Sequence, residues 1–230
     1  MRIVSWNCCL KLAAKYEHVA QLKPDILIVQ ECEQLPFDFF PEAHYHWVGH
    51  DNRKGLGILS FKEKAAIDPS FNPNLDYFLP LVFESGLKLL GVWSFTHRAE
   101  KRFGVGHKGH VSDALNYYGD WLRDSDQAIV AGDFNNSVIW DKRNKESNFY
   151  QTNQKLESMG FFSSYHSVRA EAFGNETAST FFHTKNELKP YHIDYLFLKG
   201  MKTGGVEVGT YKDWIRYSDH MPITADCFSA

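Results

Sequence analysis

The chain has 230 residues, of which 43% are hydrophobic and 15% aromatic, and this is enough for one sizeable core. Its formal net charge of −3 argues against a wholly basic surface, so bulk charge does not imply tight, sequence-blind binding to long nucleic acid, although local contact with a polyanion stays open. No apolar run approaches the ~20 residues of a membrane span, and no signal peptide is visible. We therefore predict a soluble cytoplasmic protein with a single domain over residues 1–230, and we expect a monomer.

Short apolar runs rich in Ile, Val, Leu and Phe recur along the chain, and most are bounded by Gly, Pro, Asp or Asn, as β-strands are. The expected strands lie at 2–6, 25–30, 56–61, 87–95, 127–131, 193–198 and 222–228. Apolar residues at helical spacing predict three helices between them. These carry Leu12, Tyr16, Val19 and Leu22, closed by Pro24; Val111, Leu115, Tyr118 and Leu122; and Phe149, Asn153, Leu156 and Met159, with Gly160 as the C-cap.

The balance of these elements indicates the fold class. A regular doubly wound repeat alternates strands with helices, and about ten strands with three or four helices do not fit that alternation. Two sheets packed face to face with helices outside would bury this pattern, so we predict an α/β sandwich. The cysteines have no CxxC spacing, and small buried thiols in a reducing compartment are expected at Cys8, Cys9, Cys32 and Cys227.

Several of the expected strands end in, or carry, a polar residue that is expensive to bury. A carboxylate inside an apolar strand costs several kcal/mol unless it is paired or bound to a metal. One such residue is usually structural, but a set at similar positions favours a shared cluster at one end of the sheets. Oxygen-rich ligands suit Mg²⁺ or Mn²⁺, and zinc is disfavoured there because no HExxH or Cys/His ligand spacing is present. The set comprises Asn7, Glu31, His97, Asp133, Asn135, Asp194, Asp219 and His220.

The stretch AGDFNNS, at 131–137, shows how such a pocket is built locally. Asp133 and Asn135 are two residues apart, so in an extended segment their side chains point the same way while Phe134 turns back to the core. Gly132 allows the backbone a sharp exit from the strand. The carboxylate can then take a proton from water, and the amide can hold that water or a phosphate oxygen. A turn that merely uses Asn and Asp is the alternative.

Short motifs follow one another in a fixed order over nearly the whole chain: WN at 6–7, QE at 30–31, GLGILS at 55–60, TH at 96–97, GDFN at 132–135, HIDYLF at 192–197 and SDH at 218–220. Each motif is weak alone, but the ordered set is highly specific. The sequence thereby resembles the endonuclease/exonuclease/phosphatase superfamily, also called the deoxyribonuclease-I-like fold. The resemblance implies a four-layered α/β sandwich, with two packed mixed β-sheets flanked by helices, and metal-assisted hydrolysis of a phosphate ester.

The resemblance also implies roles for individual residues, with Mg²⁺ or Mn²⁺ as the cofactor. A metal and fixed donors would stabilise charge on the phosphate oxygens while an oriented water attacks in line. Carried over by position, the implied roles are metal ligation by Glu31, with Asn7 and Asp219 nearby; water activation by Asp133; phosphate binding by Asn135, with Asn7 also in the substrate-binding set; and phosphate contact by His220, paired with Asp194, and by His97.

Two departures bear on which branch of the superfamily the chain resembles. Apurinic-site endonucleases carry an Asp two residues after the WN asparagine, where this chain has Cys9. They also use a Tyr near the phosphate, whereas Thr96-His97 is more like the deoxyribonuclease-I-type and phosphatase members. Both differences argue against a role in base-excision repair.

Residues 98–110, RAEKRFGVGHKGH, are the first candidate for substrate contact, because they follow His97 directly and are rich in basic side chains. Their glycines favour a mobile loop, which is either a solvated surface loop or an anion-binding lip beside the metal. In the second case Arg98, Lys101 and Arg102 would bind substrate. Phe181, Phe182 and Tyr191 would supply a stacking face unless they belong to the core.

Three functions remain open from the sequence. The first is a divalent-metal-dependent phosphoesterase that cleaves phosphodiester bonds of nucleic acid, as a nuclease. The second is a phosphatase or phosphodiesterase for a small phosphorylated metabolite or lipid headgroup, favoured by the slightly acidic pI of about 6.4. The third is a catalytically silent binding module, disfavoured because the positions that the mechanism needs carry suitable side chains.

Overall fold

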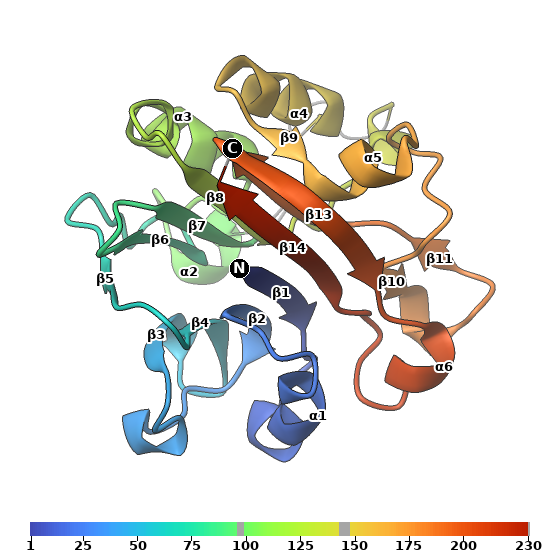
Figure 1. Ribbon diagram of the computed structural model, residues 1–230, viewed down its shortest axis with the longest axis horizontal. Coiled ribbons are helices and arrows are strands. Elements are labelled where there is room, and N and C mark those ends of the chain that lie inside the picture. Colours follow the sequence, from blue (N-terminus) through green and yellow to red (C-terminus); the bar gives the residue numbers. More distant parts are fainter. Residues whose placement is uncertain (96–98, 143–147, 230) are drawn as a thin grey trace.

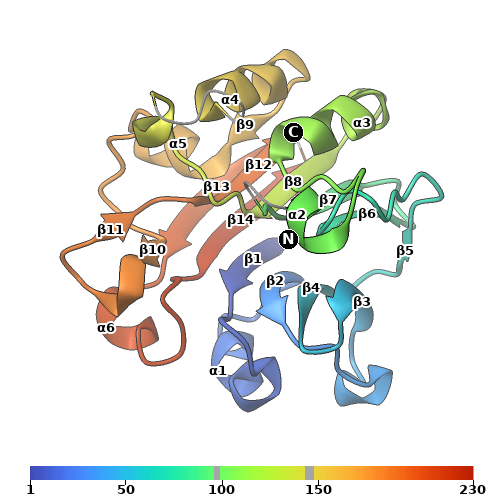
Figure 2. The same ribbon diagram turned by 180° about the vertical axis from the view of Figure 1, so that it is seen from behind.

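The structure is a computed structural model that describes residues 1–95, 99–142 and 148–229. Within these ranges, two six-stranded mixed sheets pack face to face (Figures 1 and 2). The first sheet has the order β13-β14-β1-β2-β4-β3, with bounds Met201–Val208, Ile223–Ser229, Arg2–Asn7, Ile26–Cys32, Lys54–Ser60 and His44–Asp51. The second has the order β5-β6-β7-β8-β12-β9, with bounds Ala65–Ile67, Phe78–Phe83, Lys88–Trp93, Ala128–Asp133, Asp194–Lys199 and Phe162–Ser163.

Helices and short connections complete the described part of the chain. The α-helices are α1 Tyr16–Ala20, α2 Ala99–Phe103, α3 Val111–Arg123, α4 Phe149–Ser158, α5 Ser164–Arg169 and α6 Tyr211–Trp214. Short 3-10 turns occupy Leu12–Ala14, Phe37–Phe39, Val138–Trp140 and His183–Lys185, and a small two-stranded sheet pairs β10, Phe181–Phe182, with β11, Pro190–Tyr191. None of the helices in the described ranges is both long and apolar enough to cross a membrane.

The layers follow from the alternation of side chains along each strand. In β2, Ile26 and Ile28 face the second sheet, while Leu27 and Val29 face outward, and all four are buried. A strand covered on both faces is apolar throughout, which is why ILIV reads as a continuous run. The outer face of the first sheet packs on α1 and α6, and that of the second on α3 and α4 (Figure 1). The predicted α/β sandwich of two packed mixed sheets flanked by helices is thereby confirmed.

The strand count predicted from the sequence is too low, because several strands lack a clean apolar run. Strand β3 reads HYHWVGHD and carries three histidines, and β6 contains Pro80. Strand β13 contains Gly204 and Gly205 and has a register shift beside them. Glycine and proline weaken strand patterns, so composition hid these edge and near-edge strands.

The first predicted helix is shorter than its apolar spacing suggested. Cys9, Leu10 and Lys11 have positive φ, and they deliver the chain into the 3-10 turn at Leu12–Ala14 and then into the five-residue α1. The predicted end of α4 is confirmed. Gly160 has φ +88°, and its N–H and that of Phe161 donate to carbonyls in the last helical turn, as in a Schellman motif.

Candidate active site

Four polar residues meet where strands of both sheets end. Asn7 is the last residue of β1, and Asp133 is the last of β8. Asp194 begins β12 and is the direct register partner of Asp133. His220 lies just before β14, which is antiparallel to β1, so it arrives at the same end of the first sheet. Side chains from segments more than 200 residues apart in sequence therefore share one buried location.

Asp133 lies at the centre of this location and has no exposed surface. Its Oδ2 accepts hydrogen bonds from Asn7 Nδ2 at 2.9 Å and from Asn135 Nδ2 at 3.0 Å. Its Oδ1 accepts the backbone N–H of Asn135 at 2.8 Å. Amide donors therefore hold both oxygens in place, while Oδ1 keeps a second lone pair for another donor.

His220 faces Asp133 from one side and Asp194 from the other. Its Nδ1 lies 3.0 Å from Asp194 Oδ2, while its Nε2 lies 4.0 Å from Asp133 Oδ2. The second distance is too long for a direct hydrogen bond. We call Asp133, Asp194 and His220 the buried cluster; their ligand atoms all lie within 4.8 Å of one another.

The charges in the buried cluster shift its proton affinities. Burial is the largest influence on Asp133 and, together with the charge of Asp194, raises its pKa to about 7. For His220, burial alone would lower the pKa, but the carboxylates of Asp194 and Asp133 outweigh it and raise the pKa to about 10. The imidazole is therefore held as a cation at neutral pH beside a carboxyl group that titrates near neutrality.

Two hydroxyl residues support the buried cluster in roles that the sequence did not assign, although Ser218 stands in the SDH motif at 218–220. Thr180 Oγ1 accepts the backbone N–H groups of Ile193 at 3.0 Å and Asp194 at 3.1 Å, and so fixes the start of β12. Ser218 Oγ donates to the backbone oxygen of Asn7 at 2.7 Å and accepts from the N–H of His220 at 3.0 Å. Ser and Thr are common anywhere in a chain, so only their tertiary placement identifies them as positioning residues.

The AGDFNNS stretch leaves β8 in a way that the sequence predicted only in part. Phe134 is fully buried, as expected. Asn135, however, has φ +47°, so the segment is not extended at that point; the two side chains meet because the Asn135 backbone folds back onto Asp133. Gly132 is required by close approach to β7: a Cβ there would lie 1.8 Å from the backbone oxygen of Val92, and its φ is +146°.

Glu31 sits on a β-bulge that the sequence did not reveal. The register of β2 against β4 shifts between Gln30 and Cys32, and Glu31 between them has φ +57°. A bulge turns a side chain away from the regular alternation, and a positive φ in a non-glycine residue is a form of strain often found at functional sites. The carboxylate pairs with Lys54, whose Nζ lies 2.8 Å from Glu31 Oε2.

The metal ligands predicted from the sequence are Glu31, Asn7 and Asp219. The N–H of Cys9 donates to Asn7 Oδ1 at 3.1 Å. Burial, followed by the charges of Asp219 and Glu31, raises the pKa of the Cys9 thiol. Glu31 also follows Gln30, the register partner of Asn7. Asn7 and Glu31 therefore lie at the same end of the parallel strands β1 and β2, and Asp219 directly precedes His220 of the buried cluster. All three side chains carry the oxygen donors that Mg²⁺ and Mn²⁺ prefer.

The residues predicted to bind substrate beyond this location are placed less directly. His97 and Arg98 lie outside the described residues. Lys101 and Arg102 are exposed on α2, a short helix within the stretch predicted as a loop, and the Arg102 guanidinium lies 5.1 Å from the centre of the Phe95 ring. Asn135 is held against the end of the preceding strand, because its Nδ2 donates to the backbone oxygen of Ser94 at 3.0 Å.

The comparisons with known proteins show the family and the fold of the chain. Residues 4–220 match the model of the Endonuclease/Exonuclease/phosphatase family, so the chain belongs to this family of phosphoesterases. The 3′ phosphatase NExo from Neisseria, solved with a product DNA hairpin, is 20% identical with a TM-score of 0.74, and 98% of each chain is covered. No curated protein matches the sequence.

Other solved structures share the fold at lower identity. An AP endonuclease from Archaeoglobus fulgidus is 15% identical with a TM-score of 0.67, over 98% of both chains. The human Nocturnin catalytic domain, solved with a bound sulfate anion, is 15% identical with a TM-score of 0.63, over 100% of this chain and 93% of that one. At these identities the likeness shows the fold and leaves the substrate open.

Proposed function

We propose that this protein is a divalent-metal-dependent phosphoesterase that hydrolyses phosphodiester bonds, in the manner of a nuclease. The observation that carries the proposal is the position of Asp133: fully buried, held by amide donors from Asn7 and Asn135, and 4.0 Å from the imidazole of His220. Burial of a carboxylate costs free energy, and carboxylates buried in this way are expected where they take part in a reaction.

The proposed mechanism assigns the proton transfer to Asp133. Its free lone pair accepts a proton from a water molecule, whose oxygen forms the new bond to phosphorus as the bond to the leaving oxygen breaks. Because its pKa is about 7, Asp133 is partly ionised at neutral pH and its conjugate acid can release the proton to solvent afterwards. His97, which lies outside the described residues, is the proposed donor to the leaving oxygen.

His220 and Asn135 are proposed to hold the phosphate. His220, protonated and fixed by Asp194, directs its Nε2 toward the oxygen that gains charge. Asn135 already donates both amide hydrogens, to Asp133 Oδ2 and to the backbone oxygen of Ser94, so it would bind a phosphate oxygen by redirecting one of them. When bound, a Mg²⁺ or Mn²⁺ ion held by Glu31, Asp219 and Asn7 supplies further charge neutralisation at the phosphate.

Aromatic side chains beside His220 favour nucleic acid over other phosphodiesters. The Phe181 ring lies 4.6 Å from that of His220, and Tyr191 continues the row with its ring 6.2 Å from Phe181 and 5.1 Å from Trp140. All three aromatic residues are half-buried, whereas Phe182 belongs to the core. Half-exposed rings next to a phosphate site can stack on bases.

A phosphatase or phosphodiesterase for a small phosphorylated metabolite or lipid headgroup is the second candidate. It is favoured by the net charge of −3, since enzymes of long polyanions usually gain affinity from many basic side chains.

A substrate panel tests the proposal. The protein is incubated with Mg²⁺ or Mn²⁺ and with plasmid DNA, single-stranded DNA, RNA, bis-p-nitrophenyl phosphate and p-nitrophenyl phosphate. Cleavage of nucleic acid is expected, and it should disappear with chelator. Turnover of only the small esters would replace the proposal by the second candidate. Turnover of none of them with either metal would identify a binding module.

A further inference from the structure

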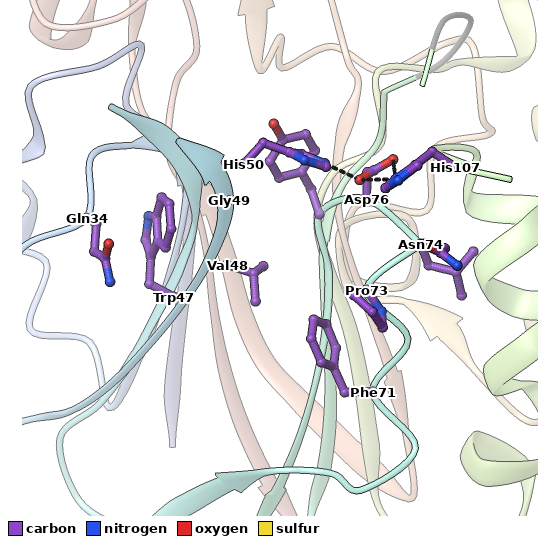
Figure 3. Close-up of a pocket in the computed structure, with 12 residues that line it drawn as sticks. Gln34, Trp47, Val48, Gly49, His50, Phe71, Pro73, Asn74, Asp76 and His107 are labelled. Carbon is purple, nitrogen blue, oxygen red and sulfur yellow. Dashed lines mark hydrogen bonds and ion pairs between the residues drawn. The ribbon is translucent and has the colours of Figure 1, made fainter. Parts of the chain in front are cut away.

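A cavity of about 460 Å³ opens between β3 and the segment 71–77 (Figure 3). Trp47 and Val48 line it from β3, and Phe71 and Pro73 line it from the other side. Three further lining residues come together at its edge: His50, Asp76 and His107. We call these three the second cluster.

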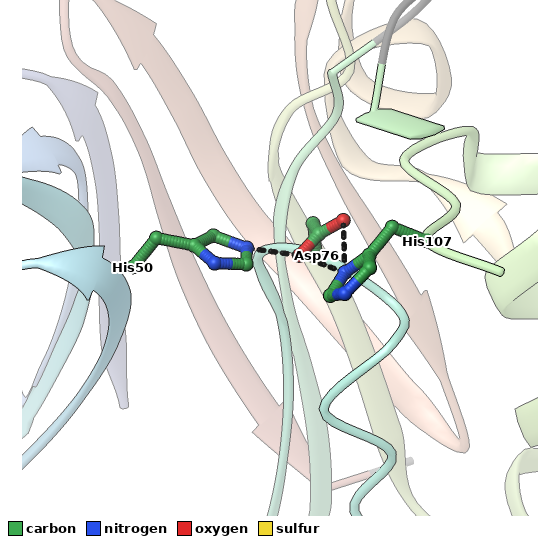
Figure 4. Close-up of side chains that lie close together, drawn as sticks. All are labelled: His50, Asp76 and His107. Carbon is green, nitrogen blue, oxygen red and sulfur yellow. Dashed lines mark hydrogen bonds and ion pairs between the residues drawn. The ribbon is translucent and has the colours of Figure 1, made fainter. Parts of the chain in front are cut away.

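The second cluster joins one carboxylate to two imidazoles (Figure 4). His107 Nδ1 lies 3.1 Å from each oxygen of Asp76, and His50 Nε2 forms a short contact with Asp76 Oδ1. The ligand atoms of all three lie within 4.8 Å of one another. The Asp76 side chain is 1% exposed, whereas those of His50 and His107 are 35% and 20% exposed, so the group is anchored inside and reachable from outside.

The three residues come from separate segments that are held together by contacts outside the cluster itself. His50 lies near the end of β3, at the edge of the first sheet, and its ring stacks on Phe103 at 3.7 Å and 3°. The backbone N–H of Asp76 donates to the oxygen of Lys108 at 2.8 Å, and that of Lys108 to the oxygen of Asn74 at 2.8 Å. The last two bonds place His107 opposite Asp76 before any ligand binds.

The second cluster is separate from the buried cluster but lies at the same end of the sheets. Tyr77, next to Asp76, packs against Trp93 with ring centres 4.3 Å apart. Trp93 is in turn the register partner of Asp133. The two clusters also differ in their side chains. The buried cluster has two carboxylates and one imidazole, whereas the second cluster has one carboxylate and two imidazoles.

We propose that His50, Asp76 and His107 bind one late first-row divalent cation, with Zn²⁺ as the best fit. Neutral imidazole nitrogens with a single carboxylate suit zinc and its neighbours rather than Mg²⁺. In a tetrahedral site with bonds of about 2.1 Å, ligand atoms lie roughly 3.4 Å apart. The distance of 3.1 Å between His107 Nδ1 and Asp76 is close to this value, whereas His50, in short contact with Asp76 Oδ1, has to move back from that oxygen as the cation enters. The two ring hydrogens that face Asp76 move to the other ring nitrogens or to solvent, and a water on the cavity side completes the coordination.

The bound cation ties the two sheets together. Its ligands belong to β3 of the first sheet, to the approach to β6 of the second sheet, and to the chain after α2. Since His50 and His107 are 57 positions apart in the numbering, the cation closes a long loop, which is where a cross-link restricts the unfolded chain most. Stability therefore rises with zinc concentration by mass action.

The test measures zinc binding to the full-length, metal-stripped protein with excess Mg²⁺ present, so that the oxygen-rich site does not take up zinc. Isothermal titration with Zn²⁺ is expected to show one tight site per chain. His50→Ala and His107→Ala are each expected to weaken it at least about 100-fold, since loss of a direct ligand costs no less than loss of its supporting partner. The matched control is His44→Ala, an exposed histidine on the same strand, which should bind zinc as the unaltered chain does.

A second variant and a spectroscopic measurement keep the outcome clear. The double variant Glu31→Gln/Asp133→Asn should retain the tight zinc site, because it alters only the proposed active site. X-ray absorption of the unaltered protein with one equivalent of Zn²⁺ should show two imidazole ligands, whether or not the histidine variants fold. Zinc affinity within threefold of the unaltered chain in both histidine variants, fewer than two imidazoles, or loss of zinc only in the double variant would overturn the proposal.

Discussion

The buried cluster and the second cluster both consist of Asp and His, but they differ in the ratio of the two residue types and in their exposure to solvent. Asp133, Asp194 and His220 are closed off from solvent, and their excess of carboxylate holds the imidazole as a cation. The second cluster has an excess of imidazole and stands open to a cavity. The comparison leads us to propose that the ratio of donors and their exposure, rather than the presence of His and Asp, decide between proton chemistry on a phosphate and retention of a cation such as Zn²⁺.

Removal of the charge at Asp133 should lower kcat far more than the same change at Asp76 in the second cluster. We expect Asp133→Asn to lower kcat on bis-p-nitrophenyl phosphate by roughly 10²–10⁴-fold, because general-base catalysis contributes that much. Asp76→Asn should cost far less, since its carboxylate lies outside the proposed reaction path. Asp120→Asn, at an exposed aspartate, controls for surface charge. If kcat falls equally in Asp133→Asn and Asp76→Asn while circular dichroism is unchanged, the proposal that catalysis depends on the buried cluster and not on the second cluster is wrong.

Substitution of Glu31 should affect the proposed Mg²⁺ site and leave the proposed zinc site unchanged. We expect Glu31→Gln to raise the Mg²⁺ concentration for half-maximal activity by at least about 10- to 100-fold, because a direct carboxylate ligand is lost. Zinc binding at the second cluster should be unaffected. Glu17→Gln, at an exposed glutamate of α1, is the control. An unchanged Mg²⁺ requirement would remove Glu31 from the proposed ligand set.

The stability of the buried cluster should depend on pH in a window set by His220. Its pKa is raised from 6.5 to about 10 in the folded state, so its stabilising contribution is complete below about pH 6.5 and is lost as the pH rises through 10. Asp133 affects stability at lower pH. Because its pKa is raised to about 7 in the folded state, its ionisation lowers the free energy of unfolding as the pH rises from about 4 to 7. We therefore expect Tm to fall between pH 7 and 10, as followed by calorimetry.

His220→Gln gives the control for this window, because it removes the titrating group and keeps a polar side chain of similar reach. The fall in Tm above pH 7 should be much smaller in that variant. A fall of the same size in both proteins would assign it to other groups and leave the cation at His220 without support.

The smallest effect is expected at Lys54, which pairs with Glu31 and is about one-third exposed. Pairs this close to solvent contribute about 0.2–1 kcal/mol, so Lys54→Met should change the half-maximal Mg²⁺ concentration only about 1.4- to 5-fold. The direction should be downward, since the ion pair competes with the metal for Glu31. The exposed Lys64→Met serves as a control. A higher Mg²⁺ requirement would indicate that Lys54 helps to build the metal site.

Much of the candidate site was predictable because its residues stand at the end or at the start of strands that can be read locally. Asn7, Asp133 and Asp194 stand at the ends of apolar runs, and the end of a buried strand falls at the edge of a sheet whatever the neighbours are. The supporting hydroxyls of Thr180 and Ser218 were not predictable, because their role depends on a hydrogen bond across more than ten residues.

The sequence by itself determined the two-sheet architecture and the strand ends that carry Asn7, Asp133 and Asp194, because alternation and apolar runs act within a few residues. Only the tertiary structure decided the bulge that turns Glu31, the αL fold of Asn135 onto Asp133, and the meeting of His50, Asp76 and His107. The last three residues are separated by 26 and 31 positions and share no spacing rule. Their proximity arises from the packing of one sheet edge against the loops of the other, which no local pattern encodes.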